Sequence, residues 1–129
     1  MTPDSQAPNA ALDRLRALCL GFPEAREVEA WGAPTFRVKT IFAMYSAPDH
    51  EGPDNRGSVW LKTDAIDQQL LIQRDTTRFF APPYVGPKGW TGVYLDGAVE
   101  WEELADLLWD AWQKSVPKKL LAAHPERPS

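Results

Sequence analysis

The stretch Phe79-Phe-Ala-Pro-Pro-Tyr-Val-Gly-Pro-Lys-Gly-Trp90 combines four aromatic residues, three prolines and two glycines with a single cation, Lys88. Proline fixes its own backbone angle and has no N–H donor, so we predict a loop here rather than a helix or a central strand. The glycines permit backbone angles and close approaches that other residues resist. We therefore expect a stiff loop that packs against the body of the protein and presents Lys88 and Trp90 outward.

The composition of the chain indicates one small domain. It has 129 residues, of which 43% are hydrophobic and 11% aromatic, enough for an ordinary core. One cysteine excludes an internal disulfide, and no apolar run suits a membrane helix or a signal peptide, so we expect a cytoplasmic protein. We predict a domain at residues 10–121, between a flexible arm at 1–9 and a flexible tail at 122–129.

The net charge of −4 argues against indiscriminate coating of DNA. The acidic residues concentrate between residues 91 and 113, however, and this segment contains no lysine or arginine. A basic patch elsewhere on the surface is therefore compatible with the overall charge.

Helical periodicity and capping signals predict three helices. The first runs from residue 10 to 20 after an Asn9 cap and buries Cys19, and residues 24–30 form an irregular connector. Asp64 caps a second helix to about residue 74, which buries Ile66, Leu70 and Leu71. Glu100 starts the last long helix, and Glu103 occupies the capping-box position.

Alternating residues predict strands at 35–38, 41–45, 58–62 and 91–95. In the third of these, Val59 and Leu61 point inward, while Trp60 and Lys62 lie on the opposite face. We expect one antiparallel sheet covered by helices on one face, an α+β fold.

Catalytic and cofactor-binding motifs are missing from the sequence. His50 in a polar loop, His124 and the buried thiol of Cys19 do not make a typical zinc site. The glycines of the loop at 86–89 lack the spacing of a phosphate-binding motif. We predict no catalytic residue, no metal and no cofactor, and nothing in the sequence supports an enzyme.

What remains is a set of cations close to aromatic residues. Cations neutralise phosphates, and exposed rings stack on bases or wedge into grooves. The alternative is that the tryptophans belong to the core and the cations to an ordinary surface. The predicted nucleic-acid-binding residues are Arg37, Lys39, Trp60, Lys62, Lys88, Trp90, Lys118 and Lys119.

Several blocks resemble the MmcQ/YjbR-like family, above all Pro83-Tyr-Val-Gly-Pro-Lys-Gly-Trp90, together with Trp31-Gly-Ala-Pro-Thr-Phe-Arg-Val38 and Val116-Pro-Lys-Lys-Leu120. The resemblance implies a compact CyaY-like α+β fold. It also implies DNA binding, through likeness to a double-wing architecture. Two departures touch the implied binding surface: Pro87 stands where members often have His, and the Lys39-Thr40 turn lacks the glycine common there.

Three hypotheses follow. The first is a non-catalytic DNA-binding module, in which Lys62, Lys88 and Lys118 contact phosphate. The second is a pocket for a small anionic aromatic ligand, formed by Trp31, Trp60, Tyr84, Trp90 and Lys88. The third is a protein-interaction or dimer surface made by the same tryptophans. A monomer is favoured, and no membrane partner is expected.

Overall fold

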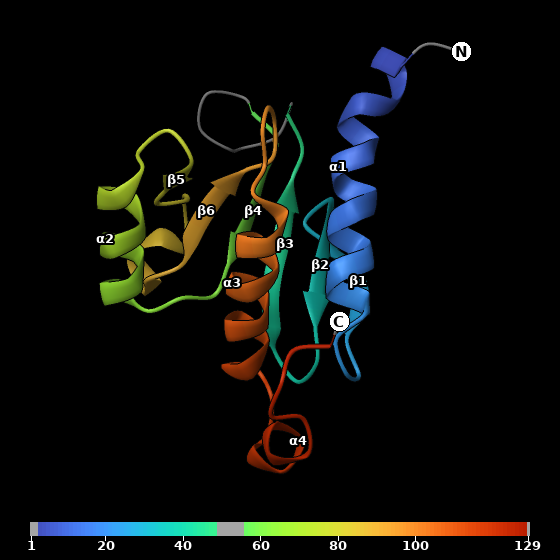
Figure 1. Cartoon of the computed structure of the whole chain (residues 1–129), viewed down its shortest axis with the longest axis vertical. Helices are drawn as coiled ribbons and strands as arrows, with labels where there is room; N and C mark the ends of the chain where they lie inside the picture. Colours follow the sequence, from blue (N-terminus) through green and yellow to red (C-terminus); the bar gives the residue numbers. More distant parts are fainter. Residues whose placement is uncertain (1–2, 49–55, 129) are drawn as a thin grey trace.

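The computed structural model describes residues 3–48 and 56–128. Within them, six strands form one antiparallel sheet in the order β1-β2-β3-β4-β6-β5, accompanied by four α-helices (Figure 1). The predicted α+β class with a single antiparallel sheet is confirmed. The strands are β1 (Arg26–Ala30), β2 (Ala33–Arg37), β3 (Ile41–Ser46), β4 (Ser58–Leu61), β5 (Phe79–Phe80) and β6 (Thr91–Tyr94). The helices are α1 (Pro3–Leu20), α2 (Ala65–Arg74), α3 (Trp101–Gln113) and α4 (Lys118–Ala123), and η2 (Gly86–Lys88) is a short 3-10 helix.

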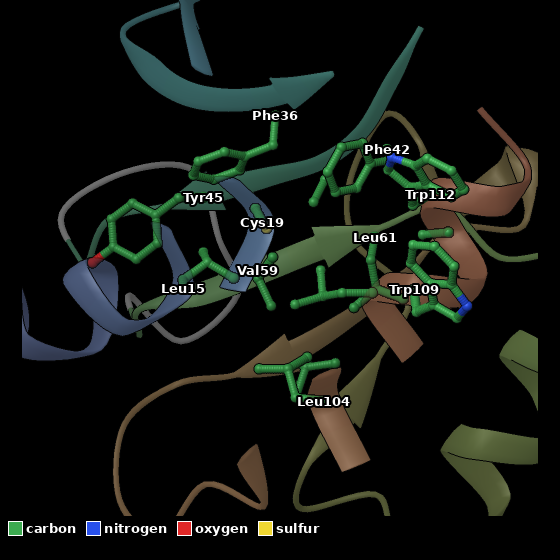
Figure 2. Packing of buried hydrophobic residues seen from close by; sticks show 14 of the residues in the cluster. Leu15, Cys19, Phe36, Phe42, Tyr45, Val59, Leu61, Leu104, Trp109 and Trp112 are labelled. Atoms are coloured by element: carbon green, nitrogen blue, oxygen red, sulfur yellow. The ribbon is translucent and has the colours of Figure 1, made fainter. Parts of the chain in front are cut away.

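One face of the sheet carries the core. In the structure α1 packs on β1, and α3 packs on β3 and β4 (Figure 1). The rings of Trp109 and Trp112 on α3 stack with centroids 4.4 Å apart, and the indole N–H of Trp112 donates to the carbonyl of Pro23. Val59 and Leu61 point into this cluster, as the alternation of the strand predicted (Figure 2).

An irregularity in the β2–β3 pairing decides which side chains of β3 reach the core. The register shifts opposite Phe36 and Arg37 of β2, so the two-residue alternation of β3 is broken there. As a result Phe42 joins Tyr45 in the core cluster, while Ile41 and Met44 line a cleft.

The predicted start of α2 is right, but its predicted burial is wrong for Ile66 and Leu70 and right only for Leu71. Asp64 caps the helix by accepting a hydrogen bond from the N–H of Asp67. Ile66 and Leu70, however, are 70% and 59% exposed. The helix packs on the edge strand β5 with an inward stripe of Gln68, Leu71 and Ile72. Because this stripe includes a polar residue, hydrophobicity alone did not identify it.

The beginning of the chain also differs from the prediction. Helix α1 starts at Pro3, so Asn9 lies inside it and is not its cap. Residues 26–30, expected in an irregular connector, form the edge strand β1. Of the charged residues that concealed this strand, Glu27 is paired with Arg16 on α1, which donates to its carboxylate from Nε at 2.9 Å and from a terminal NH2 group at 3.0 Å.

The predicted capping box of α3 is not formed. Glu100 occupies the cap position but makes no side-chain cap hydrogen bond. Glu103 instead accepts hydrogen bonds from Arg74 and Arg78. These arginines lie on α2 and just before β5, so the pairing ties α3 to that end of the sheet.

The predicted polar loop with His50 falls largely at residues 49–55, outside the described residues. Across the parts of the chain that are described, no helix is both long and apolar enough to cross a bilayer.

Candidate functional site

The sheet carries a cleft of about 560 Å³ next to the loop at 81–90. Trp60 and Met44 lie directly opposite each other on β4 and β3, on the face away from the core. Among the described residues that line the cleft, Lys88 alone carries a charge. The lining consists of Ala30, Trp31, Ala33, Ile41, Met44, Tyr45, Ser46, Trp60, Tyr84, Val85, Lys88 and Trp90.

The loop that carries Lys88 is fastened to α2. The side-chain amide of Gln68 donates to the carbonyls of Gly86 and Trp90, at 2.9 and 2.6 Å. The hydroxyl of Thr63 donates to the carbonyl of Gly89 at 2.5 Å. These side-chain bonds to backbone carbonyls fix the loop at its middle and its end. Of the stretch predicted as a loop, residues 79–80 form the edge strand β5 and residues 86–88 form the single turn η2.

Gly89 makes the fastening possible. Its φ is 98°, in the left-handed region. A Cβ atom at this position would lie 2.8 Å from the backbone nitrogen of Ala65 and 2.9 Å from the carbonyl carbon of Asp64. The backbone of the loop therefore rests on the first turn of α2, with no room for a side chain between them.

Two exposed aromatic residues flank the cleft, and both have strained backbones. Trp31 (φ 54°) precedes Gly32 (φ 74°) at the tip of the β1–β2 hairpin, and its side chain is 77% exposed. Tyr84 (φ 66°), in the loop on the other side, is 68% exposed. A positive φ is uncommon for bulky residues and costs energy. The fold thus holds two large rings at the rims of one cleft in unfavourable backbone conformations.

Trp60 lies below these rims. It is buried, and its indole N–H donates to the hydroxyl of Ser58 at 3.1 Å. The sequence placed Trp60 on the face opposite Val59 and Leu61, and the structure has it there, as part of the cleft lining.

The cations near the cleft differ in how far they are engaged. Lys88 is exposed, and its ammonium group makes no hydrogen bond or ion pair with any residue of the described segments. Lys62 donates to the hydroxyl of Thr40 at 3.0 Å and lies 6.0 Å from the ring centroid of the half-buried Trp90. Partial burial lowers the pKa of Lys62. Lys88 is thus the cation available to a ligand in the cleft.

The other predicted binding residues lie outside the cleft lining. Arg37 is half-buried and donates to the hydroxyl of Thr35 at 3.0 Å, and Lys39 is exposed at the turn between β2 and β3. Lys118 and Lys119 are exposed on α4, which lies beyond the end of α3 (Figure 1). The structure therefore brings Trp60, Lys88 and Trp90 together, with Lys62 beside Trp90.

The sequence did not indicate the part of the site on β3. Met44 and Ser46 line the cleft, and both share the strand face of Trp60 through the pairs Met44↔Trp60 and Ser46↔Ser58. Met44 and Ser46 are two residues apart and so share a face, but to identify that face requires the register between β3 and β4.

Two groups weighed in the sequence, the Cys19 thiol and a metal site, do not contribute to the cleft. Cys19 is fully buried in the core, and burial raises the pKa of its thiol. Within the described segments, no group of three His, Cys, Asp or Glu side chains could hold a metal ion. The cleft offers flat apolar surfaces and one ammonium group.

A family model described as YjbR matches residues 20–114 of the chain. The chain belongs to the YjbR family. The resemblance expected from the loop and hairpin blocks is thereby confirmed.

Two solved structures resemble this YjbR protein. The crystal structure of Deinococcus radiodurans protein DR2400, with a DUF419 domain, has 23% sequence identity and a TM-score of 0.69, over 87% of this chain and 86% of that one. A Pseudomonas syringae protein has 16% identity and a TM-score of 0.61, over 90% of this chain and all of that one. These likenesses support the fold alone. No curated protein matches the chain.

The segment matched to the YjbR family contains the whole cleft, from Ala30 on β1 to Trp90. Lys118 and Lys119 lie beyond its end at residue 114.

Proposed function

We propose that this YjbR protein is a non-catalytic binding module whose cleft holds a small anionic ligand with a flat aromatic body. The observation that carries the proposal is one unpaired cation within an apolar cleft walled by aromatic rings, formed by Trp31, Trp60, Tyr84, Trp90 and Lys88.

The size and lining of the cleft support a small molecule. Its volume of about 560 Å³ is within the range of roughly 300–1,000 Å³ that small-molecule sites occupy. Such sites combine apolar and aromatic walls with a few polar groups that fix orientation. Indole and phenol rings also stack well on flat ligands.

The charge of the cleft supports an anion. None of the described residues that line it is acidic, so nothing there neutralises Lys88. A carboxylate or phosphate placed against this ammonium group would form a charge-assisted hydrogen bond, which is stronger than a neutral one.

Matched probes test the proposal. Indole-3-acetate and its neutral amide, indole-3-acetamide, share shape but differ in charge, and tryptophan fluorescence and thermal shift report binding of each. We expect the acid to bind more tightly than the amide. Lys88→Met is expected to weaken binding of the acid about tenfold, because one charged hydrogen bond is lost. The same substitution should leave binding of the amide unchanged.

Lys118→Met is the matched control, because it removes an exposed lysine on α4, outside the cleft. Equal weakening by both substitutions, or no binding of any flat anionic probe in a broader thermal-shift screen, would contradict the proposal.

DNA binding is a second candidate, favoured by the cations at one end of the cleft. Lys62 donates a hydrogen bond to Thr40, in the turn that also carries Lys39. Lys62 also lies beside Trp90, and Trp90 follows Lys88 by two residues. Lys62 thus contacts both segments that carry the other two lysines, and cations on neighbouring segments suit contacts with phosphates. In this candidate, Trp90 would provide a ring beside the contacted strand.

Salt dependence separates the two candidates. DNA affinity should fall steeply as salt rises, and Lys62→Ala or Lys88→Ala should each reduce the slope of log K against log salt by about one. A duplex that produces no change in fluorescence anisotropy at low salt would remove this candidate and leave the ligand proposal intact.

A further inference from the structure

The cleft contains a second polar group whose hydrogen-bonding capacity is unused. Ser46 at the end of β3 is 3% exposed, and its hydroxyl has no hydrogen-bond partner among the described residues. An unpaired buried hydroxyl is unfavourable, because it has lost its bonds to water without replacing them.

The position of Ser46 directs this hydroxyl to the cleft. Ser46 lies two residues beyond Met44, so the two share a strand face, and both line the cleft. Ser58 lies directly opposite on β4, and its hydroxyl accepts the indole N–H of Trp60. No hydrogen bond joins the hydroxyls of Ser58 and Ser46, so the Ser46 hydroxyl keeps its capacity for a ligand.

Ser46 lies at the other end of the cleft from Trp90. The lining of β3 runs from Ile41 to Ser46, which is about 16 Å at roughly 3.3 Å per residue. Lys62 connects Trp90 to Thr40, the residue before Ile41, so the ring of Trp90 lies at the Ile41 end.

We infer that Ser46 is a specificity-determining residue, and that the ligand is an elongated aromatic anion with a hydroxyl or carbonyl group remote from its charge. The anion contacts Lys88, the rings hold the body, and the remote polar group completes the bonding of the Ser46 hydroxyl. This inference rests on the proposed function and refines its ligand class.

Probes of two lengths test the inference. The long pair is biphenyl-4-carboxylate and 4′-hydroxybiphenyl-4-carboxylate, and the short pair is benzoate and 4-hydroxybenzoate. We expect the remote hydroxyl to tighten binding of the long probe about threefold to tenfold, the usual effect of one hydrogen bond, and to do little for the short probe. Ser46→Ala should abolish the gain while leaving biphenyl-4-carboxylate unchanged.

A measurement without ligand gives an independent check. Because the Ser46 hydroxyl is unpaired, Ser46→Ala should leave the urea midpoint unchanged or raise it. Ser115→Ala is the matched control, since the buried Ser115 hydroxyl donates to the carbonyl of Ala111 at 3.0 Å, and its midpoint should fall.

The outcomes separate this inference from the proposal beneath it. If the carboxylates bind through Lys88 but the remote hydroxyl brings no gain, or the gain survives in Ser46→Ala, the role of Ser46 is overturned and the ligand proposal stands. A midpoint that falls as far in Ser46→Ala as in Ser115→Ala also overturns it. If no probe binds at all, the proposed function itself fails.

Discussion

Replacing Gly89 with alanine should separate the loop from α2. A Cβ on Gly89 would come within 3.0 Å of two backbone atoms, the nitrogen of Ala65 and the carbonyl carbon of Asp64. Backbone atoms at the start of a capped helix cannot rotate away as the end of a side chain can. The loop must therefore move, and it carries Lys88 and Trp90 with it.

Gly97 provides the comparison that gives the magnitude. Its φ is 78°, also left-handed, but a Cβ there would meet nothing within 4 Å. Gly97→Ala should therefore incur only the left-handed backbone term, about 1–2 kcal/mol. Gly89→Ala should add overpacking of about 1–3 kcal/mol. The change in the unfolded chain is the same for both substitutions and cancels in the difference.

Urea unfolding followed by tryptophan fluorescence measures both variants. We expect Gly89→Ala to be less stable than Gly97→Ala by about 1–3 kcal/mol. We also expect Gly89→Ala, but not Gly97→Ala, to lose binding of the anionic aromatic probe. Equal free energies of unfolding for the two variants would refute the close packing of the loop on α2, and with it the argument for how Lys88 is positioned.

Three further predictions follow from particular contacts. Burial opposes the charge of Glu103, but hydrogen bonds from Arg78 and Arg74 hold the pKa of its carboxyl below the ordinary 4.5. These hydrogen bonds therefore stabilise the folded state fully above pH 4.5, and the stabilisation is lost as the pH falls through the lowered pKa. In urea unfolding, Glu103→Gln should therefore cost about 0.5–1 kcal/mol at pH 7, after allowing for solvent screening, and progressively less as the pH falls below 4.5. A loss that stays the same as the pH falls through the acid transition would contradict this pairing. Gly92→Ala should destabilise the fold by about 1–3 kcal/mol, because its Cβ would lie 2.3 Å from the ring of Phe80. The Phe80→Ala/Gly92→Ala double variant should lose less stability than the two single variants together. Strict additivity would show that the ring is not displaced. Trp31→Asn should leave the thermal midpoint equal or raise it, because asparagine tolerates the left-handed position of this turn. The same substitution should weaken probe binding. A lowered midpoint would show that the indole stabilises the fold.

The sequence predicted the central strands because their alternation is regular. Val59 and Leu61 were placed inward and Trp60 outward, and the structure agrees. Strand β1 was missed because it is rich in charge, and the pairing of Glu27 with Arg16 depends on how α1 packs against the strand. Strand β5 was missed because two residues followed by prolines give no periodic signal.

The site was only partly predictable for a similar reason. Lys88 and Trp90 stand out in the sequence, since a proline- and glycine-rich loop with one cation is an unusual local composition. Ser46 has no such local signal. Its importance depends on which strand lies beside it and on whether its hydroxyl finds a partner, and both are properties of the folded chain.

The strained residues around the cleft support the proposed binding role of this surface. Three non-glycine residues in the described segments have a positive φ: Glu24, Trp31 and Tyr84. Glu24 lies in the turn after α1, so a left-handed residue is not by itself a sign of function. Trp31 and Tyr84 differ because each holds a large, exposed ring at the rim of one apolar cleft. A sequence selected for stability alone would place glycine or asparagine there. A bound ligand that covers both rings would offset the cost of the two strained backbones, and this compensation exists only in the complex.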